Sequence, residues 1–315
     1  MKFETEIFDL EKHIAELEKF ANEKNIDLTE EIEKLQKKHR NMLEKIYSNL
    51  SSWDKIFVAR HPDRPYTLDY IRELGEDFVE LHGDRLFRDD PAIVGGICKI
   101  EGKRVMIIGH QKGRTTEEKI HRNFGMANPE GYRKALRLFR MAEKFRIPVL
   151  AFIDTPGAYP GIEAEKHGQG EAIARNLMEM SGIKTPMISV VIGEGGSGGA
   201  LGLGVTDRIF MLQNSVYSVI SPEGCAAILY KDSSRAPEAA ENLKISANSL
   251  LELGVIDGII PEPVGGAHRD HTLAAQNLKS AVFKALEELE CLKIDSLLDE
   301  RYHKYRNMGK FLESF

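Results

Sequence analysis

Apolar residues recur with helical spacing along the first fifty residues, and charged residues fill the faces between them. The apolar series is Leu10, Ile14, Leu17, Leu28, Ile32, Leu35, Met42, Ile46 and Leu50. Asn25-Ile26-Asp27 interrupts this series and has the composition of a turn. We therefore predict a helical hairpin over residues 1–55. The pattern fits a contact for a partner subunit as well as a helical pair packed on its own domain.

The pattern changes after residue 60. Pro62 and Pro65 disfavour helix, and Thr67 offers an N-cap for a helix that we expect to run to about Leu81. Residues 92–100 and 104–110 are rich in β-branched and small residues and are separated by a Glu-Gly-Lys turn. These features predict a β-hairpin at the start of the main domain.

Strand and helix patterns alternate along the rest of the chain. We predict strands at 148–154, 186–193, 207–213 and 216–220, and helices at 130–146, 168–182, from 198, from 222 and at 270–290. Apolar strands that alternate with amphipathic helices indicate an α/β fold with buried, largely parallel strands. We assign residues 56–293 to this domain and residues 294–315 to a C-terminal tail.

Composition narrows the class of protein. The chain has 315 residues, of which 42% are hydrophobic and 29% charged, as in a globular protein with a substantial core. The net charge of −6 provides no overall basic field for nucleic acid. The three cysteines, Cys98, Cys225 and Cys291, are far apart, so we expect reduced thiols and no metal site on this chain. No apolar run reaches membrane-spanning length, and we expect a cytoplasmic protein.

A glycine-rich turn at residues 193–200 (GEGGSGGA) is the strongest chemical signal. It follows a predicted strand and precedes a helix, so its backbone amides could hold an oxyanion or a phosphate. A P-loop does not fit, because no Gly-Lys-Ser/Thr follows and the first lysine after the turn is Lys231. Gly193, Gly195 and Gly198 match a dinucleotide fingerprint, but the next strand ends in Gln and Asn where an acidic residue is needed. Two interpretations of the glycines remain. They could form an oxyanion hole from backbone amides, or they could serve only the close packing of the helix on the strand.

A second turn, residues 153–161 (IDTPGAYPG), also follows a predicted strand. Ligands bind at the carboxyl ends of strands in open α/β folds, so we expect both turns to line one site. Its candidate binding residues are Gly157, Ala158, Tyr159 and Gly161.

Lys112 and Arg114 follow the second strand of the predicted β-hairpin and are candidates for phosphate or carboxylate binding. We find no Gly-x-Ser-x-Gly elbow and no evident side-chain nucleophile. This favours chemistry in which the substrate or a cofactor supplies the reacting groups.

Several longer segments resemble the carboxyltransferase alpha family of acetyl-CoA carboxylase. They are RPYTLDY (64–70), IVGG (93–96), MIIGHQKGR (106–114), NFGM (123–126), PEGYRKALR (129–137), residues 153–161, GEGGSGGAL (193–201), YSVISPEGC (217–225) and IIPEP (259–263). The resemblance covers nearly the whole chain and implies a crotonase-type (ClpP/crotonase) spiral of ββα units.

The resemblance also implies roles. Gly198 and Gly199 would donate backbone amides to the ureido oxygen of biotin, with Gly195 and Gly196 beside them. Biotin would arrive as carboxybiotin on a biotin carboxyl carrier protein that biotin carboxylase has charged, and would not be attached to this chain. A beta subunit with a zinc ribbon would hold acetyl-CoA, in an α2β2 heterotetramer. The product, malonyl-CoA, would begin fatty acid synthesis, and no side-chain base is required.

Two other functions compete with this one. A stand-alone crotonase-type acyl-CoA hydratase or isomerase would need a carboxylate base, for which Glu163, Glu194 and Glu223 are candidates. A non-catalytic scaffold would tolerate disruption of the turn at Gly198.

Overall fold

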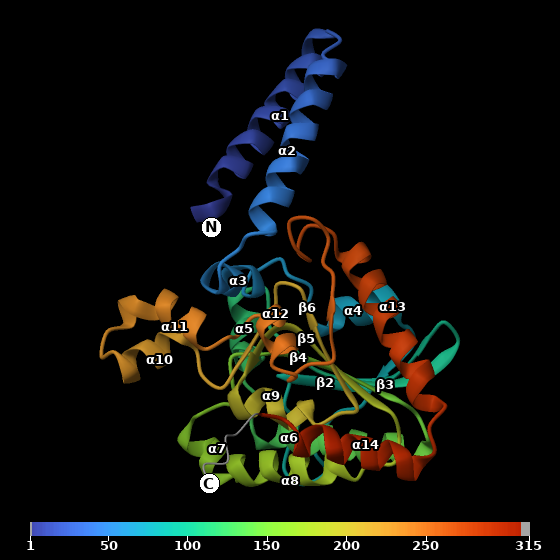
Figure 1. Cartoon of the computed structure of the whole chain (residues 1–315). Helices are drawn as coiled ribbons and strands as arrows, with labels where there is room; N and C mark the ends of the chain where they lie inside the picture. The colour runs from blue at the N-terminus through green and yellow to red at the C-terminus, as the bar shows by residue number, and fades with distance from the viewer. Residues whose placement is uncertain (1, 310–315) are drawn as a thin grey trace.

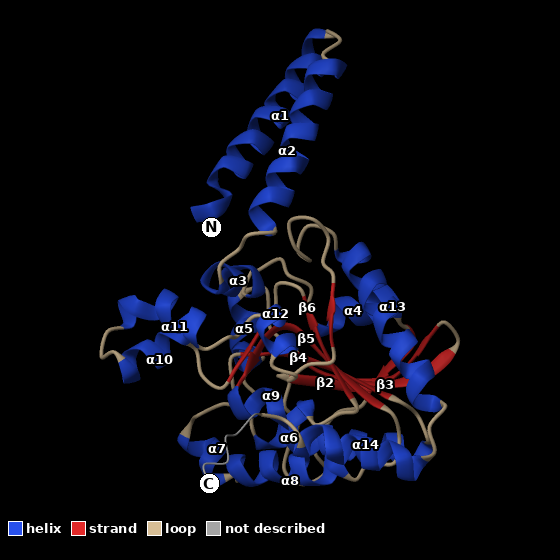
Figure 2. Cartoon of the chain, in the orientation of Figure 1, coloured by secondary structure: helices blue, strands red, loops and turns tan. Residues whose placement is uncertain are grey.

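The chain folds around one mixed β-sheet flanked by helices, in a computed structural model that describes residues 2–309 (Figures 1 and 2). Among these residues the sheet has eight strands in the order β1-β2-β3-β4-β5-β6-β8, and β7 pairs with β5. The first three strands are antiparallel neighbours, and every pairing from β3 onward is parallel. The strands are β1 Glu76–Glu80, β2 Ile93–Ile100, β3 Lys103–His110, β4 Val149–Thr155, β5 Met187–Gly196, β6 Arg208–Leu212, β7 Val216–Ser218 and β8 Gly258–Ile260.

Helices cover both faces of the sheet. One core cluster joins the sheet to α6 and α8, and the other joins it to α4 and α13 (Figure 1). The α-helices are α1 Thr5–Lys24, α2 Thr29–Tyr47, α3 Ser52–Ala59, α4 Thr67–Leu74, α5 Thr116–His121, α6 Pro129–Phe145, α7 Ile162–Lys166, α8 Gln169–Ser181, α9 Ser197–Gly204, α10 Pro222–Leu229, α11 Ala236–Asn242, α12 Ala247–Glu252, α13 His271–Glu290 and α14 Ile294–Arg306. Short 3-10 turns occur at Lys2–Glu4, Asn123–Gly125 and Ser233–Arg235.

The predicted order of strands and helices is confirmed from residue 93 onward. The β-hairpin closes through Glu101 and Gly102, whose φ angles of 50° and 76° suit a tight two-residue turn. The expected helix from Thr67 to Leu81 is wrong in its second half, because α4 ends at Leu74. Gly75 takes an extended backbone there, and the next residues pair with β2 as strand β1.

The N-terminal segment forms the predicted helical hairpin, which projects away from the sheet (Figure 1). Asn25 ends α1 in a left-handed conformation (φ 51°). At its base, Ile7 and Leu43 pack with Val58 of α3, and Arg269 Nη1 lies 2.5 Å from Glu11 Oε1. The hairpin thus packs on the main domain at one end only, and a partner contact by the rest of it stays a prediction.

The segment that the sequence assigns to a C-terminal tail contains helix α14. Its Arg301 side chain is fully buried, and its guanidinium nitrogens lie 2.8 and 2.9 Å from the Asp207 carboxylate oxygens. Residues 310–315 of the predicted tail and Met1 of the predicted hairpin lie outside the described residues. The division of the chain into three domains stays a prediction.

A buried ion pair between Arg64 and Glu262 holds the segment before α4 against β5. Arg64 donates to both carboxylate oxygens of Glu262, at 3.0 and 2.6 Å, and to the carbonyl oxygen of Ile192 in β5. Glu262 also accepts from the backbone N–H of Asn214 and of Ala267. Both charged side chains are buried, so each depends on the other for compensation.

We expect Arg64→Met to lower the free energy of unfolding by about 3–5 kcal/mol, because it leaves the Glu262 carboxylate buried and unpaired. Equilibrium unfolding in urea measures this. The double variant Arg64→Met/Glu262→Gln should lose less than Arg64→Met alone. Lys12→Met, which removes an exposed pair 3.9 Å long, is the control and should change stability by less than about 1 kcal/mol. Equal losses in the Arg64 and Lys12 variants would contradict the prediction.

Candidate active site

The two glycine-rich turns lie against each other at the carboxyl ends of β4 and β5. A Cβ atom on Gly196 would stand 2.1 Å from the carbonyl oxygen of Pro156, and one on Gly199 would stand 2.6 Å from the backbone nitrogen of Ala158. Such distances are too short for any side chain. The two turns are therefore in direct contact, and the expectation that both line one ligand site stays a prediction.

Gly198 and Gly199 occupy the first turn of α9. The N-cap residue, Gly196, has no side chain to accept from that turn, and the first N–H groups of a helix have no intrahelical acceptor. The positive end of the helix dipole adds to their attraction for an anion. Gly199 has no room for a side chain, whereas a Cβ on Gly198 would meet Ile173 carbon atoms at an ordinary 3.6 Å.

Ser197 stands between these glycines in a strained position. It is exposed, its φ is 50°, and Gly195, Ser197 and Gly199 match the Gly-x-Ser-x-Gly pattern of a strand-to-helix nucleophile elbow. The sequence interpretation missed this match. Among the described residues no hydrogen bond joins the Ser197 hydroxyl to a histidine or a carboxylate. The turn therefore has the shape of an elbow without the base that would activate its serine.

The second turn is held by hydrogen bonds and by close packing around Tyr159. The Thr155 hydroxyl donates to the Gly157 carbonyl oxygen at 2.7 Å, and Gly157 has a φ of 155°. Tyr159 donates its N–H to the Ala127 carbonyl oxygen at 3.0 Å. A Cβ on Gly161 would stand 2.4 Å from the Tyr159 ring, so the turn packs closely around that ring. A binding role for these residues and for Ala158 stays a prediction.

Lys112 and Arg114 already have partners within the chain. Lys112 Nζ lies 2.7 Å from Asp154 Oδ1 and 2.9 Å from Glu194 Oε2, and its side chain is largely buried. The Arg114 guanidinium lies over the Tyr66 ring and pairs with Asp69 at 2.5 Å. The structure brings Lys112 to the glycine-rich turn and places Arg114 against the segment before α4. Substrate binding by either side chain stays a prediction.

Arg60, at the end of α3, completes the charged cluster and was missed by the sequence interpretation. Its Nε lies 2.6 Å from Glu194 Oε1, and its Nη1 lies 2.7 Å from Glu223 Oε1. These partners are more than a hundred residues away in sequence, and no local motif marks Arg60.

The three candidate carboxylate bases are poorly suited to proton abstraction. Burial alone would raise the pKa of Glu194, but the positive charges of Lys112 and Arg60 have the larger combined effect and lower it to about 2. Hydrogen bonding to Arg60 lowers the pKa of Glu223 against the opposing effect of burial. Glu163 is exposed and pairs with Lys166 at 2.6 Å. A general base works best with a pKa near the operating pH, so this site does not favour a hydratase or isomerase.

Two adjoining hollows flank the glycine-rich turn. One has a volume of about 230 Å³ and is lined by Tyr66, Lys112 and Phe124, among others. The other, of about 40 Å³, is lined by Gly195, Gly196 and the apolar residues Ile56, Val216, Ile220, Pro222 and Ile245. Arg60, Pro156 and Glu194 border both hollows. A flat, partly apolar group could therefore reach the turn between polar side chains.

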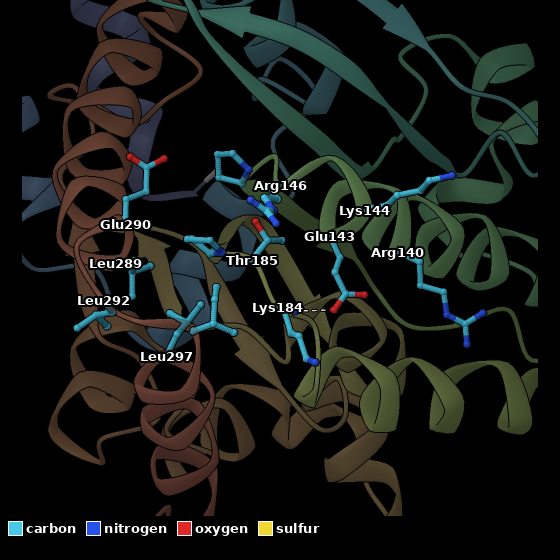
Figure 3. Close-up of a pocket in the computed structure, with 13 residues that line it drawn as sticks. Arg140, Glu143, Lys144, Arg146, Lys184, Thr185, Leu289, Glu290, Leu292 and Leu297 are labelled. Atoms are coloured by element: carbon cyan, nitrogen blue, oxygen red, sulfur yellow. Dashed lines mark hydrogen bonds between the residues drawn. The ribbon is translucent and has the colours of Figure 1, made fainter.

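A larger hollow of about 770 Å³ lies at the opposite ends of the strands (Figure 3). Leu289, Leu292 and Leu297 lie on one side of it, and Glu143 on the other accepts from the Lys184 backbone N–H. None of the predicted site residues lines it.

Two kinds of feature are absent among residues 2–309. These residues contain no group of three or more His, Cys, Asp or Glu side chains that could hold a metal ion. None of the helices in this range is both long and apolar enough to cross a membrane.

Comparison with known proteins identifies the family. Residues 1–309 match the model of the family described as acetyl co-enzyme A carboxylase carboxyltransferase-like. The chain is 67% identical to the acetyl-coenzyme A carboxylase carboxyl transferase subunit alpha of Fusobacterium nucleatum, over 99% of both chains. It is 58% identical to the subunit of the same name from Geobacter metallireducens, over 99% of this chain and 98% of that one.

Solved structures share the fold at low sequence identity. A transcarboxylase 12S structure matches with a TM-score of 0.54 at 19% identity, over 69% of this chain and 43% of that one. A Pseudomonas malonate decarboxylase hetero-tetramer in complex with coenzyme A matches with a TM-score of 0.59 at 16% identity, over 74% and 91% of the two chains. The fold is thus the crotonase-type α/β fold that the sequence predicted.

The two glycines of the first helical turn should respond differently to the same added methyl group. Gly198→Ala adds only an ordinary contact and should change the free energy of unfolding by less than about 1 kcal/mol. Gly199→Ala forces the two turns apart and should cost about 1–3 kcal/mol. Thermal unfolding of the purified variants tests this, and equal melting temperatures would count against the observed packing.

Proposed function

The chain belongs to the acetyl-CoA carboxylase carboxyltransferase family and is a transferase of the alpha-subunit type, and from this we propose how it divides the reaction with its partners. In the proposal it provides the biotin half of an active site that transfers a carboxyl group from carboxybiotin to acetyl-CoA, giving malonyl-CoA. The first-turn amides of Gly198 and Gly199, which no N-cap side chain accepts from, carry this proposal.

The residues around the turn fit a biotin ring system. The ureido oxygen is a small acceptor that suits two adjacent backbone donors, and the apolar residues of the smaller hollow suit the faces of the ring. Bound carboxybiotin supplies the activated carboxyl group. The amides of Gly198 and Gly199 orient the ureido oxygen and stabilise negative charge on it, as backbone donors of an oxyanion hole do.

Glycine is also required at positions 195, 196 and 199, because the space around each of them is filled. Side chains at positions 196 and 199 would push the two turns apart, and one at position 195 would stand 2.7 Å from the Tyr217 ring. We assign Gly195, Gly196, Gly157, Ala158, Tyr159 and Gly161 to the walls of the biotin site. No residue of this chain is assigned as a base, because Glu194, the carboxylate within the glycine-rich turn, is held ionised by Arg60 and Lys112.

Exposed apolar residues surround the site and support a partner there. They lie on α5, the turn after it, α7 and the α10 region, which Figure 1 shows on one side of the sheet: Ile120, Phe124, Ile162, Val219, Ile228 and Leu229. An apolar group of this extent is typical of a surface that a partner covers. We assign this face to a beta subunit that holds acetyl-CoA and carries its own zinc. The two subunits would form an α2β2 assembly in the cytoplasm. A biotin carboxyl carrier protein would bring biotin to it, after biotin carboxylase has carboxylated that biotin.

We expect the purified chain alone to form no malonyl-CoA from acetyl-CoA and carboxybiotin, because it holds only half of the site. Adding the beta subunit should restore transfer, measured as radiolabelled carboxyl incorporated into malonyl-CoA. Hydration of enoyl-CoA by the isolated chain should stay at background. Substantial malonyl-CoA formation without a partner would refute the division of the site.

Charge on the exposed apolar face should block assembly without harming the fold. We expect Ile228→Glu/Leu229→Glu to weaken binding of the beta subunit at least about tenfold, because the new carboxylates would be desolvated at the interface. Analytical ultracentrifugation measures this. Phe145→Glu, at another exposed apolar position that lines a separate hollow with Ile97 and Ile147, is the control and should leave assembly unchanged. Normal assembly of the double variant would show that the interface with the beta subunit lies on another face of the chain.

A further inference from the structure

A buried charged cluster adjoins the proposed biotin site, and three of its members, Arg60, Lys112 and Glu194, line the hollow of about 230 Å³. Lys112 follows β3, Asp154 belongs to β4 and Glu194 belongs to β5, so the cluster joins the carboxyl ends of three neighbouring strands. The Lys112 ammonium lies within 2.9 Å of both carboxylates, and the three side chains are between 1% and 13% exposed. Buried charges are costly, so a cluster of this kind needs an explanation.

The cluster contacts the start of the glycine-rich turn. Asp154 Oδ1 accepts from the Glu194 backbone N–H at 2.9 Å, and a Cβ on Gly193 would stand 2.4 Å from the same oxygen. On the other side, a Cβ on Gly125 would stand 2.9 Å from Lys112 Cγ. A shift of the charged side chains would therefore also displace the backbone at the start of the turn.

The balance of charge depends on Lys112. The cluster has the cations Lys112 and Arg60 and the carboxylates Asp154, Glu194 and Glu223. Arg60 contacts Glu194 and Glu223, whereas the ion-pair partner of Asp154 is Lys112. Without the Lys112 ammonium, an uncompensated buried carboxylate would stand beside the turn whose amides face the ureido oxygen. Its field would oppose negative charge on that oxygen, and a buried position would weaken screening by solvent.

We infer that Lys112 is a positioning residue of carboxyl transfer, which compensates the charge of Asp154 and Glu194 beside the turn so that no unpaired buried carboxylate opposes the Gly198 and Gly199 amides. This inference rests on the proposed function. It differs from the prediction that Lys112 binds substrate, because both of its close partners are carboxylates of its own chain. A contact with substrate would chiefly affect KM, whereas a field at the ureido oxygen would chiefly affect kcat.

The test uses the assembled complex with the beta subunit and follows carboxylation of free biotin by malonyl-CoA, so that kcat and the KM for biotin are both measured. We expect Lys112→Met to lower kcat about 10- to 100-fold while the KM for biotin changes less than about twofold. The loss should be smaller at pH 6 than at pH 8, because an unpaired buried carboxyl has a raised pKa and becomes neutral as the pH falls. Lys112→Met/Asp154→Asn should recover at least half of the lost kcat on a logarithmic scale.

Lys134→Met provides the matched control. Lys134 is also a buried lysine, paired with Asp89 at 2.6 Å, and it does not line either hollow beside the turn. Its removal should lower the melting temperature but leave kcat of the folded complex within about twofold. A structural effect of Lys112 alone would make the two lysine variants behave alike.

The outcomes separate the inference from the proposed function. A wild-type complex that carboxylates no biotin would refute the proposed function itself. With an active wild type, three results would overturn the role of Lys112: a normal kcat in Lys112→Met, a raised KM with unchanged kcat, or a double variant no faster than Lys112→Met.

Discussion

One ammonium group between two buried carboxylates ties the site to the sheet. The strands β3, β4 and β5 are parallel neighbours, so their carboxyl ends meet, and Lys112 there joins Asp154 to Glu194. Glu194 is also part of the glycine-rich turn, which leads from the end of β5 into α9. The sheet therefore positions the charged cluster, the cluster contacts the start of the turn, and the turn leads into the first turn of α9, where Gly198 and Gly199 lie.

This arrangement explains why the site works through backbone amides. Glycine at 196 and 199 lets two turns touch, and a side chain at either position would separate them. The carboxylates nearby are engaged by Lys112 and Arg60, which lower the pKa of Glu194 to about 2, so Glu194 stays ionised and paired at neutral pH. A chain that offers donors and no poised base suits the transfer of a group from one bound molecule to another, which agrees with membership of a carboxyltransferase family.

Much of the fold could be predicted from sequence because the signals are local. The alternation of apolar strands with amphipathic helices placed most elements, and the glycines at 193–199 marked the turn. The helix expected to reach Leu81 failed because pairing with β2, a contact distant in sequence, decides the state of residues 76–80. Arg60 was missed for the same reason, since its partners Glu194 and Glu223 come close only in the fold. The elbow at Ser197 did have a local signal, the Gly-x-Ser-x-Gly pattern, but its strain and its lack of a base needed the structure.

The most direct test of the central claim is a crystal structure of the assembled complex with biotin bound. The account predicts the ureido oxygen within about 2.7–3.1 Å of the backbone nitrogens of Gly198 and Gly199, with Lys112 still paired to Asp154 and Glu194. A ureido oxygen held instead by side chains, or by the Lys112 ammonium, would contradict it.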